Sequence, residues 1–230
     1  MPKTEGAAQE DWAGHFARED ARYCDGEARL ADEHGADPDA RQRQLTRLGN
    51  AAGGAGLALL MQGRADDGGE WFARAAERYR ESFADAPPGS WGRPIGAMKA
   101  LLLSGDWPRA EEAARWALDC GAADAESPIG RYAAALATLV LGRDAEAREH
   151  ADAIRTHSDF PHDVGDALAF IAAQDVAGYV TAVESVLESF ETREEYLEDL
   201  PVADTVLVLQ ALAQRRGIAA ELSSPLLPSA

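Results

Sequence analysis

The segment IRTHSDFPHDVGDAL, residues 154–168, contains the residue types that could do chemistry. His157, Asp159 and His162 lie close together in it. Imidazole nitrogens and carboxylate oxygens are common ligands of zinc and other transition metals, and the same groups serve as general acids and bases. The segment therefore raises two hypotheses, a metal-dependent hydrolase that uses this loop, or a polar boundary between two helices.

The spacing of these residues favours the helix boundary. His150 and His157 are seven residues apart, so on one helix they would lie two turns, or about 10 Å, from each other, which is too far for one ion. We expect Asp163 to occupy an N-cap position, with Asp166 three residues later, where carboxylates satisfy free backbone N–H groups. We therefore predict no metal site. The alternative metal set is His157, Asp159 and His162.

Other catalytic patterns are missing from the sequence. It contains no HExxH, GxSxG, Walker or dinucleotide-binding motif. Cys24 and Cys120 are far apart and have no CxxC partner, which excludes a cysteine zinc site. The glycine cluster at residues 53–56 has no nearby lysine, so it favours a close helix crossing over a phosphate cradle. We therefore predict no catalytic residues, no cofactor and a protein that is not an enzyme.

The chain is strongly acidic. Asp and Glu total 40 against 22 Lys and Arg, for a formal net charge of -18, and the only lysines are Lys3 and Lys99. Such a surface repels phosphate backbones, so we expect no nucleic-acid partner. Two explanations remain open: adaptation to a halophilic host, or recognition of a basic protein partner.

The sequence shows no membrane or export signal. No apolar run approaches the roughly 20 residues that span a bilayer. The N-terminal MPKTEGAAQEDW lacks the basic and apolar segments of a secretory signal. We therefore expect no membrane partner and a cytoplasmic location.

A repeat of about 34 residues organises the chain. Pro-Ile-Gly occurs at residues 94–96 and again 34 residues later at 128–130, and Pro161 follows 33 residues after Pro128. Repeats of this length are typical of stacked helical hairpins. The turns inside the hairpins are expected at Gly63, Gly105, Gly142 and Gln174.

Apolar residues follow the helical period. After Gln174 they recur with the i, i+3, i+4, i+7 spacing of one buried helix face. The same stripe occurs at residues 71–83, and alternating strand patterns are almost absent. We predict an all-α fold, a right-handed stack of antiparallel helical hairpins with about ten helices. It forms one domain, with an N-terminal helical cap at 1–44, hairpins at 45–200, and a capping helix with a Pro-rich tail at 201–230.

Residues 95–118, IGAMKALLLSGDWPRAEEAARWAL, resemble a tetratricopeptide repeat. They have small residues where helices would cross, Gly105-Asp106 at the turn, and Ala113 and Ala117 in the second helix. The resemblance covers about residues 45–190. It implies a superhelical α-α stack that binds other proteins.

The C-terminal quarter, residues 175–228, is similar to the end of immunity protein family 49. The similarity rests on Leu200-Pro201, an apolar helix at 206–213, Gly217, and the terminal segment SPLLP at 224–228. It implies a protein that binds a polymorphic toxin through a surface and not an active site. The same features also suit a helix that simply caps the stack, starting near Pro201 and stopping at Gly217.

Together these patterns predict a non-catalytic protein-binding helical-repeat protein that sequesters a basic partner in a groove. The groove would be lined by the first helix of each hairpin, where a few polar side chains interrupt small and apolar residues. The alternative is the metal-dependent hydrolase described above. The predicted partner-binding residues are Arg93, Lys99, Arg131, Tyr132 and Asp166.

Overall fold

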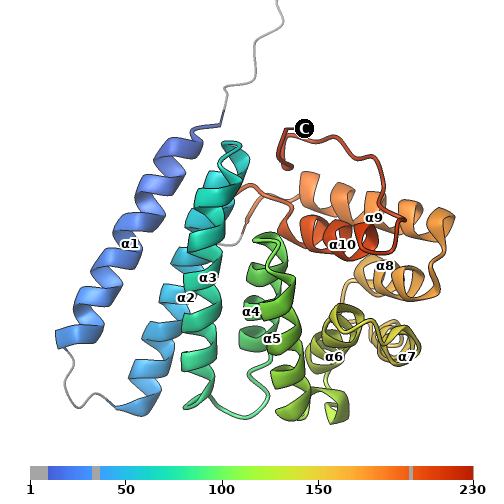
Figure 1. The fold of residues 1–230 in the computed structure, drawn as a ribbon, viewed down its shortest axis with the longest axis horizontal. Helices are drawn as coiled ribbons and strands as arrows, with labels where there is room; N and C mark the ends of the chain where they lie inside the picture. Colours follow the sequence, from blue (N-terminus) through green and yellow to red (C-terminus); the bar gives the residue numbers. More distant parts are fainter. Residues whose placement is uncertain (1–9, 33–36, 197–198, 230) are drawn as a thin grey trace, which may run out of the picture.

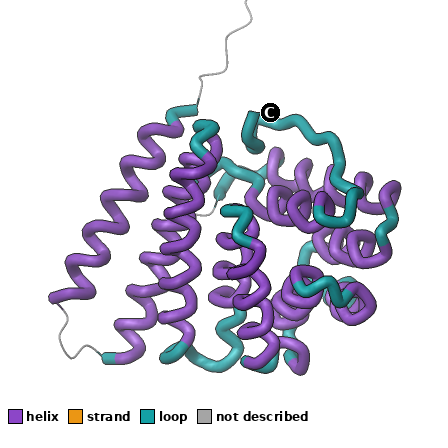
Figure 2. The backbone as a smooth tube through the Cα atoms, viewed as in Figure 1, coloured by secondary structure: helices purple, strands orange, loops and turns teal. Residues whose placement is uncertain are grey.

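The structure, a computed structural model, describes residues 10–32, 37–196 and 199–229. Within these ranges it is all-α, with ten α-helices, one short 3-10 helix and no strand (Figures 1 and 2). The predicted all-α fold of about ten helices is confirmed. The helices are α1 (Trp12–Asp32), α2 (Pro38–Met61), α3 (Ala65–Phe83), α4 (Gly92–Leu103), α5 (Trp107–Asp119), η1 (Ala122–Asp124), α6 (Pro128–Val140), α7 (Asp144–Ile154), α8 (His162–Ala173), α9 (Val176–Glu191) and α10 (Asp204–Gln214).

Each helix packs against the next one along the chain, so the pairs α2–α3, α4–α5, α6–α7 and α8–α9 form hairpins. The first helices of neighbouring hairpins also contact one another, since α4 packs against α6 and α6 against α8. These helices form an inner layer. The last helix, α10, folds back onto α4, α8 and α9.

The four hairpin turns lie where the sequence predicts them. Gly63, Gly105 and Gly142 have φ angles of 74°, 72° and 69°, and Gln174 has a φ of 54°. This left-handed conformation ends an α-helix by turning the chain out of the helical path, and glycine adopts it without a Cβ penalty. The predicted turns are therefore confirmed.

Aspartate side chains cap two of the helices, but not the helix where the sequence predicts such a cap. The carboxylates of Asp106 and Asp175 accept hydrogen bonds from backbone N–H groups in the first turns of α5 and α9. The predicted cap at Asp163 is wrong. The cap of α8 is Pro161, two residues before Asp163, and the Asp163 carboxylate accepts from the neighbouring Val164 N–H at 2.9 Å. The fixed φ of proline suits a helix start, which explains the shift.

Small residues in α2 allow its neighbours to approach closely. A Cβ at Gly54 would lie 3.0 Å from Glu19 Cγ of α1, and one at Gly56 would lie 2.7 Å from the Phe72 ring of α3. The predicted close crossing is therefore confirmed at these two glycines. Gly53 differs, because a Cβ there would meet no atom within 4 Å.

Some predicted boundaries need correction. The boundary at 44/45 falls inside α2, and part of the predicted 1–44 cap lies outside the described residues. The helix α10 starts at Asp204 and not near Pro201, since residues 201–203 are not yet helical, although Gly217 ends the turn after it with a φ of 70°. On α9 most of the predicted apolar stripe is buried, but Val180 is only partly buried and Val176, in the first turn, is 52% exposed.

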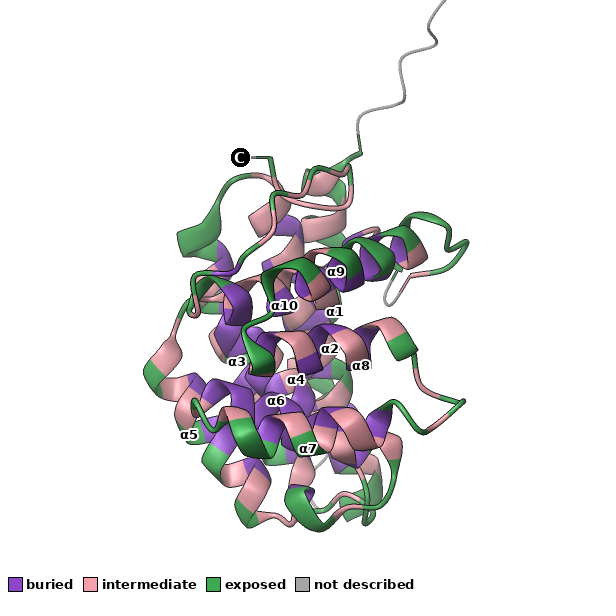
Figure 3. Cartoon of the chain, turned by 90° about the vertical axis from the view of Figure 1, so that its right-hand side faces the viewer, coloured by how far each residue is buried: buried purple, intermediate pink, exposed green. Residues whose placement is uncertain are grey.

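Buried residues lie on the facing sides of the helices, and exposed ones on their outer sides (Figure 3). The C-terminal tail covers α10: Ala203 N–H donates to Leu226 O at 3.0 Å, and the Gln210 amide bonds both backbone groups of Ala220. None of the helices in the described part of the chain is long and apolar enough to cross a membrane.

Candidate binding pocket

A pocket of about 530 Å³ lies on the inner layer of the stack. The helices α2, α4, α6 and α8 contribute its floor, and two aromatic side chains reach into it from α3. Residues from the end of α9, from the α9–α10 connection and from the start of α10 also line it. The hairpins thus position the pocket by bringing four inner helices together.

The α9–α10 connection covers the inner layer. Figure 1 shows it running from α9 towards α2 and α3 before it returns to α10. The Leu200 side chain packs directly against Gly54 of α2. Further on, Asp204 forms an ion pair with Lys99 of α4 at 2.5 Å. The inner face is therefore a pocket that is closed on this side, and not an open groove along the stack.

The pocket walls are largely aromatic and aliphatic. The rings of Tyr132 and Phe160 pack at 5.4 Å between centroids. A ligand with an apolar body would gain burial against such walls. The aromatic lining residues are Phe72, Tyr79, Tyr132, Phe160, Phe190 and Tyr196.

The charges of the pocket are opposite to those of the whole chain. Its described lining residues include three cationic side chains, those of Arg93, Lys99 and Arg193, and one carboxylate, that of Asp204. The chain as a whole carries a formal net charge of -18. The pocket is therefore a locally cationic site within an acidic protein.

The charge of Lys99 is already neutralised. Its ammonium group donates to Asp204 Oδ2 at 2.5 Å and to Thr205 Oγ1 at 3.3 Å. Burial on its own lowers the pKa of Lys99, but the Asp204 carboxylate outweighs this effect, so the pKa lies above its ordinary value. Lys99 fastens the start of α10 to α4.

Arg93 has only neutral partners among the described residues. Its Nε donates to Ser82 Oγ at 2.8 Å, and its Nη2 donates to Gln42 Oε1 at 2.5 Å. Ser82 is completely buried, and Gln42 is nearly so, which fixes the guanidinium in place. Burial lowers the pKa of Arg93, and no carboxylate offsets that effect. An arginine nevertheless stays charged at neutral pH, so Arg93 is a partly desolvated cation without an anion beside it.

Two further polar groups face the pocket. The guanidinium of Arg193 lies 3.7 Å from the Phe190 ring centroid, and its Nε donates to Ser189 O at 3.2 Å. Tyr132 is 6% exposed, and its hydroxyl has no hydrogen-bond partner in the described part of the chain. Burial raises the pKa of Tyr132, so this hydroxyl keeps its proton and can donate.

Three of the five predicted partner-binding residues, Arg93, Lys99 and Tyr132, line this pocket. Arg131 and Asp166 lie elsewhere. Arg131 Nη1 donates to the backbone oxygen of Ala123 at 3.1 Å, and the Asp166 carboxylate pairs with Arg155 at 2.5 Å. Both are on inner-layer helices, but their side chains reach the adjoining segments η1 and the end of α7.

The histidine segment does not assemble a metal site. In the described ranges no group of three or more His, Cys, Asp or Glu side chains could hold an ion. His150 lies in α7, where its ring nitrogen is 3.4 Å from Arg131 Nη1, and burial followed by the Arg131 charge lowers its pKa. His157 lies in the turn after α7, and His162 opens α8. The hydrolase hypothesis therefore has no geometric support from this loop.

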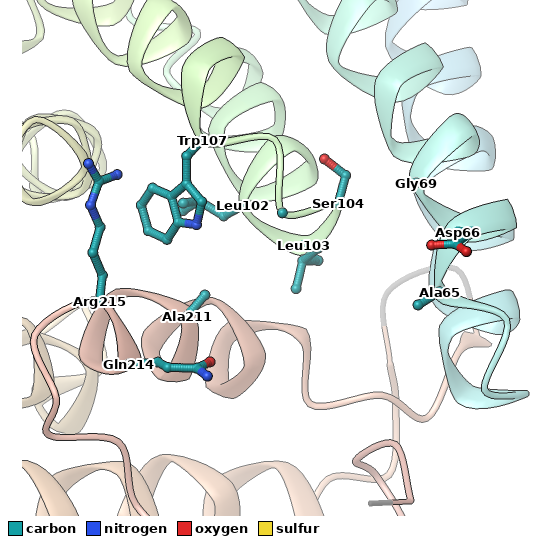
Figure 4. A pocket seen from close by; sticks show the side chains of 11 residues that line it. Ala65, Asp66, Gly69, Leu102, Leu103, Ser104, Trp107, Ala211, Gln214 and Arg215 are labelled. Carbon is teal, nitrogen blue, oxygen red and sulfur yellow. The ribbon is translucent and has the colours of Figure 1, made fainter.

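A second cleft lies between α3, the α4–α5 turn and α10 (Figure 4). Its strongest polar group is Arg215, which stacks over the Trp107 ring at 4.3 Å and pairs with Glu111 at 3.0 Å. Leu103 lines both this cleft and the pocket. Because the Arg215 cation is already neutralised, we take the pocket as the candidate site.

Sequence reasoning missed the residues that close the pocket. Asp204 comes from the start of α10, which the sequence pattern describes as a cap, whereas Arg193 and Tyr196 come from the connection directly after α9. One available signal was Asp204 itself, a charged residue at the start of a very apolar segment. Ser82 and Gln42, which accept hydrogen bonds from Arg93, belong to no sequence pattern that would identify them.

Comparisons of the chain with protein-family models, with curated proteins and with solved structures find no match.

Proposed function

We propose that this chain is a non-catalytic binding protein and that the pocket is its ligand site. The observation that carries this proposal is the pocket itself, which has a volume of about 530 Å³ and is lined by aromatic walls and a few fixed polar groups. This volume and lining are typical of pockets that bury a ligand.

A basic protein partner is a separate part of this proposal. The net charge of -18 and the similarity of residues 175–228 to an immunity protein support it. Because the pocket is locally cationic, such a partner would contact the acidic outer surface, and not the groove as the sequence suggests. Its association rate should fall as salt rises, because salt screens the attraction between opposite charges.

Gly53 offers a way to test the pocket without disturbing the fold. It lines the pocket, and a Cβ there would meet no atom within 4 Å. A Gly53→Phe substitution should therefore fill the pocket instead of clashing with the core. Gly69→Phe is the matched control, because Gly69 lines the second cleft and its Cβ would approach Ser104 Cβ at 3.9 Å.

The experiment measures binding of Nile red, a neutral apolar dye, by its fluorescence. We expect the native protein and Gly69→Phe to bind the dye with similar affinity, and Gly53→Phe to lose at least about tenfold in affinity, equivalent to roughly 1.4 kcal/mol. Circular dichroism confirms that all three proteins are folded. Dye binding that survives Gly53→Phe unchanged would show that the pocket is not the ligand site.

A further inference from the structure

We propose that the pocket binds a small organic acid, with the carboxylate at Arg93 and an apolar body along the aromatic walls. This inference rests on the proposed function and adds the chemical class of the ligand.

The first argument is the unused hydrogen-bonding capacity of Arg93. A guanidinium has five N–H donors in a planar fork that matches a carboxylate. The described residues occupy one donor at Nε and one at Nη2, and none of them accepts from Nη1. Since Ser82 and Gln42 hold the fork from the protein side, a ligand carboxylate can bind it without a large loss of side-chain entropy.

The second argument is that nearby carboxylates are committed to other cations. Asp204 pairs with Lys99 at 2.5 Å. Asp39 accepts from the Gln42 amide at 2.8 Å and forms an ion pair with Arg43. A partly buried cation without an anion is costly, so an incoming carboxylate is stabilised by the charge it neutralises.

The third argument concerns the remaining polar groups. Arg193 adds a second cation that no described carboxylate neutralises, and it favours entry of an anion over entry of a cation. The Tyr132 hydroxyl adds a hydrogen-bond donor on the same pocket. Between these groups the walls are aromatic, which suits a hydrocarbon or an aromatic body but not a second charge.

The fourth argument concerns size. An extended polypeptide bound along a helical stack would run across several hairpins. Here Leu200 packs against Gly54, and Asp204 is fastened to Lys99, so the α9–α10 connection crosses that path. The pocket volume of about 530 Å³ matches a small molecule.

The test is displacement of Nile red by decanoate, decanamide and decylammonium, which share one hydrocarbon tail and differ in charge. We expect decanoate to bind at least about tenfold more tightly than decanamide, and decylammonium to bind most weakly. Equal affinities of decanoate and decanamide would overturn the proposal while leaving the proposed function intact. Failure of Nile red to bind would instead count against both.

Variants locate the carboxylate. Arg93→Gln should weaken decanoate by about 10- to 100-fold, because the charged contact is lost. Nile red binding to the same variant shows whether the pocket is still formed. The control Arg131→Gln removes the same charge from α6 outside the pocket and should change neither affinity. Arg93→Lys keeps the charge but loses the planar fork, so it should fall between the native protein and Arg93→Gln.

Two results would overturn the assignment. Decanoate affinity unchanged in Arg93→Gln, with Nile red still bound, would remove Arg93 from the site. Tighter displacement of the dye by an acidic, leucine-rich hexapeptide than by decanoate would favour a protein segment over a small acid.

Discussion

Lys99 and Arg93 lie on the same helix and line the same pocket, yet they have different roles. Lys99 is held by Asp204, a residue 105 positions later in the chain, whereas Arg93 is held by two neutral side chains. An ion pair between distant residues fixes tertiary structure. A fixed cation without an anion is available to a ligand. We therefore assign Lys99 a structural role and Arg93 a binding role.

Removing one partner of the Lys99–Asp204 pair should destabilise the fold. The two side chains are 19% and 24% exposed, so Lys99→Met leaves a largely buried carboxylate. We expect a loss of about 1–3 kcal/mol in the free energy of unfolding, less than for a fully buried pair. The double variant Lys99→Met/Asp204→Asn should recover part of this loss. Urea unfolding of the native protein, Lys99→Met, Asp204→Asn and the double variant measures the coupling, and strictly additive losses would show that the pair does not stabilise α10.

The same pair predicts a dependence on alkaline pH. The pKa of Lys99 is raised in the folded protein, so its contribution to stability is fully present below its ordinary pKa, about 10.4, and is lost as pH rises through the folded value. The stability difference between the native protein and Lys99→Met should therefore shrink above about pH 10.5. Groups that titrate alike in both proteins cancel in this difference. A difference that stays constant or grows would contradict the raised pKa.

The hairpin turns show how much of the fold a sequence can reveal. A glycine after an apolar run predicts a left-handed helix end because of its conformational freedom, and three of the four turns follow this rule. Gln174 adopts the same conformation with a side chain, and the sequence marks it as a turn because it follows one apolar stretch and precedes another. The Asp163 cap was wrong because proline and aspartate both favour helix starts, and the sequence does not show which of them ends the loop.

The turns give a matched pair of substitutions. Gln174→Gly should raise the free energy of unfolding by up to about 1 kcal/mol, because it relieves a left-handed residue with a side chain. Gly142→Gln makes the reverse change at the preceding hairpin and should cost about 1 kcal/mol. Both effects are measured by urea unfolding. Effects of equal sign at the two turns would refute the account of their conformation.

The close helix crossings give a second matched pair of substitutions. Tyr79 lies between Gly49 of α2 and Gly96 of α4, and a Cβ at Gly96 would approach its ring at 2.7 Å. Gly96→Ala should therefore cost about 1–3 kcal/mol through overpacking. Gly53→Ala adds the same methyl group to a helix facing open space and should be neutral or stabilising by up to about 1 kcal/mol. Thermal unfolding of both variants is the measurement, and equal losses would argue against the crossing.

The closed inner layer is a property of the whole chain that the sequence did not predict. The period and the apolar stripes depend on neighbouring residues, so they predict helices and hairpins. Contacts such as Leu200–Gly54 join segments far apart in sequence, and no local pattern encodes them. Arg131 and Asp166 show a related limit, because helix periodicity alone does not tell which polar residues of an inner helix face the pocket.

The acidic surface should make stability depend on salt. Repulsion among carboxylates weakens the compact state in dilute buffer, and added ions screen it. If the charge is a halophilic adaptation, the melting temperature should rise by at least about 2–4 °C between dilute and molar KCl, equivalent to roughly 1 kcal/mol for a chain of this size. A melting temperature that stays level would favour partner recognition as the reason for the charge.

A crystal structure of the protein with decanoate tests the ligand site most directly. We expect electron density for one decanoate in the pocket, with its carboxylate within about 3 Å of Arg93 Nη1 and its tail against the aromatic walls, including Tyr132 and Phe160. The same crystals grown from Gly53→Phe should show the phenyl ring in place of the tail. Decanoate bound only outside the pocket, or a carboxylate that points away from Arg93, would contradict the account.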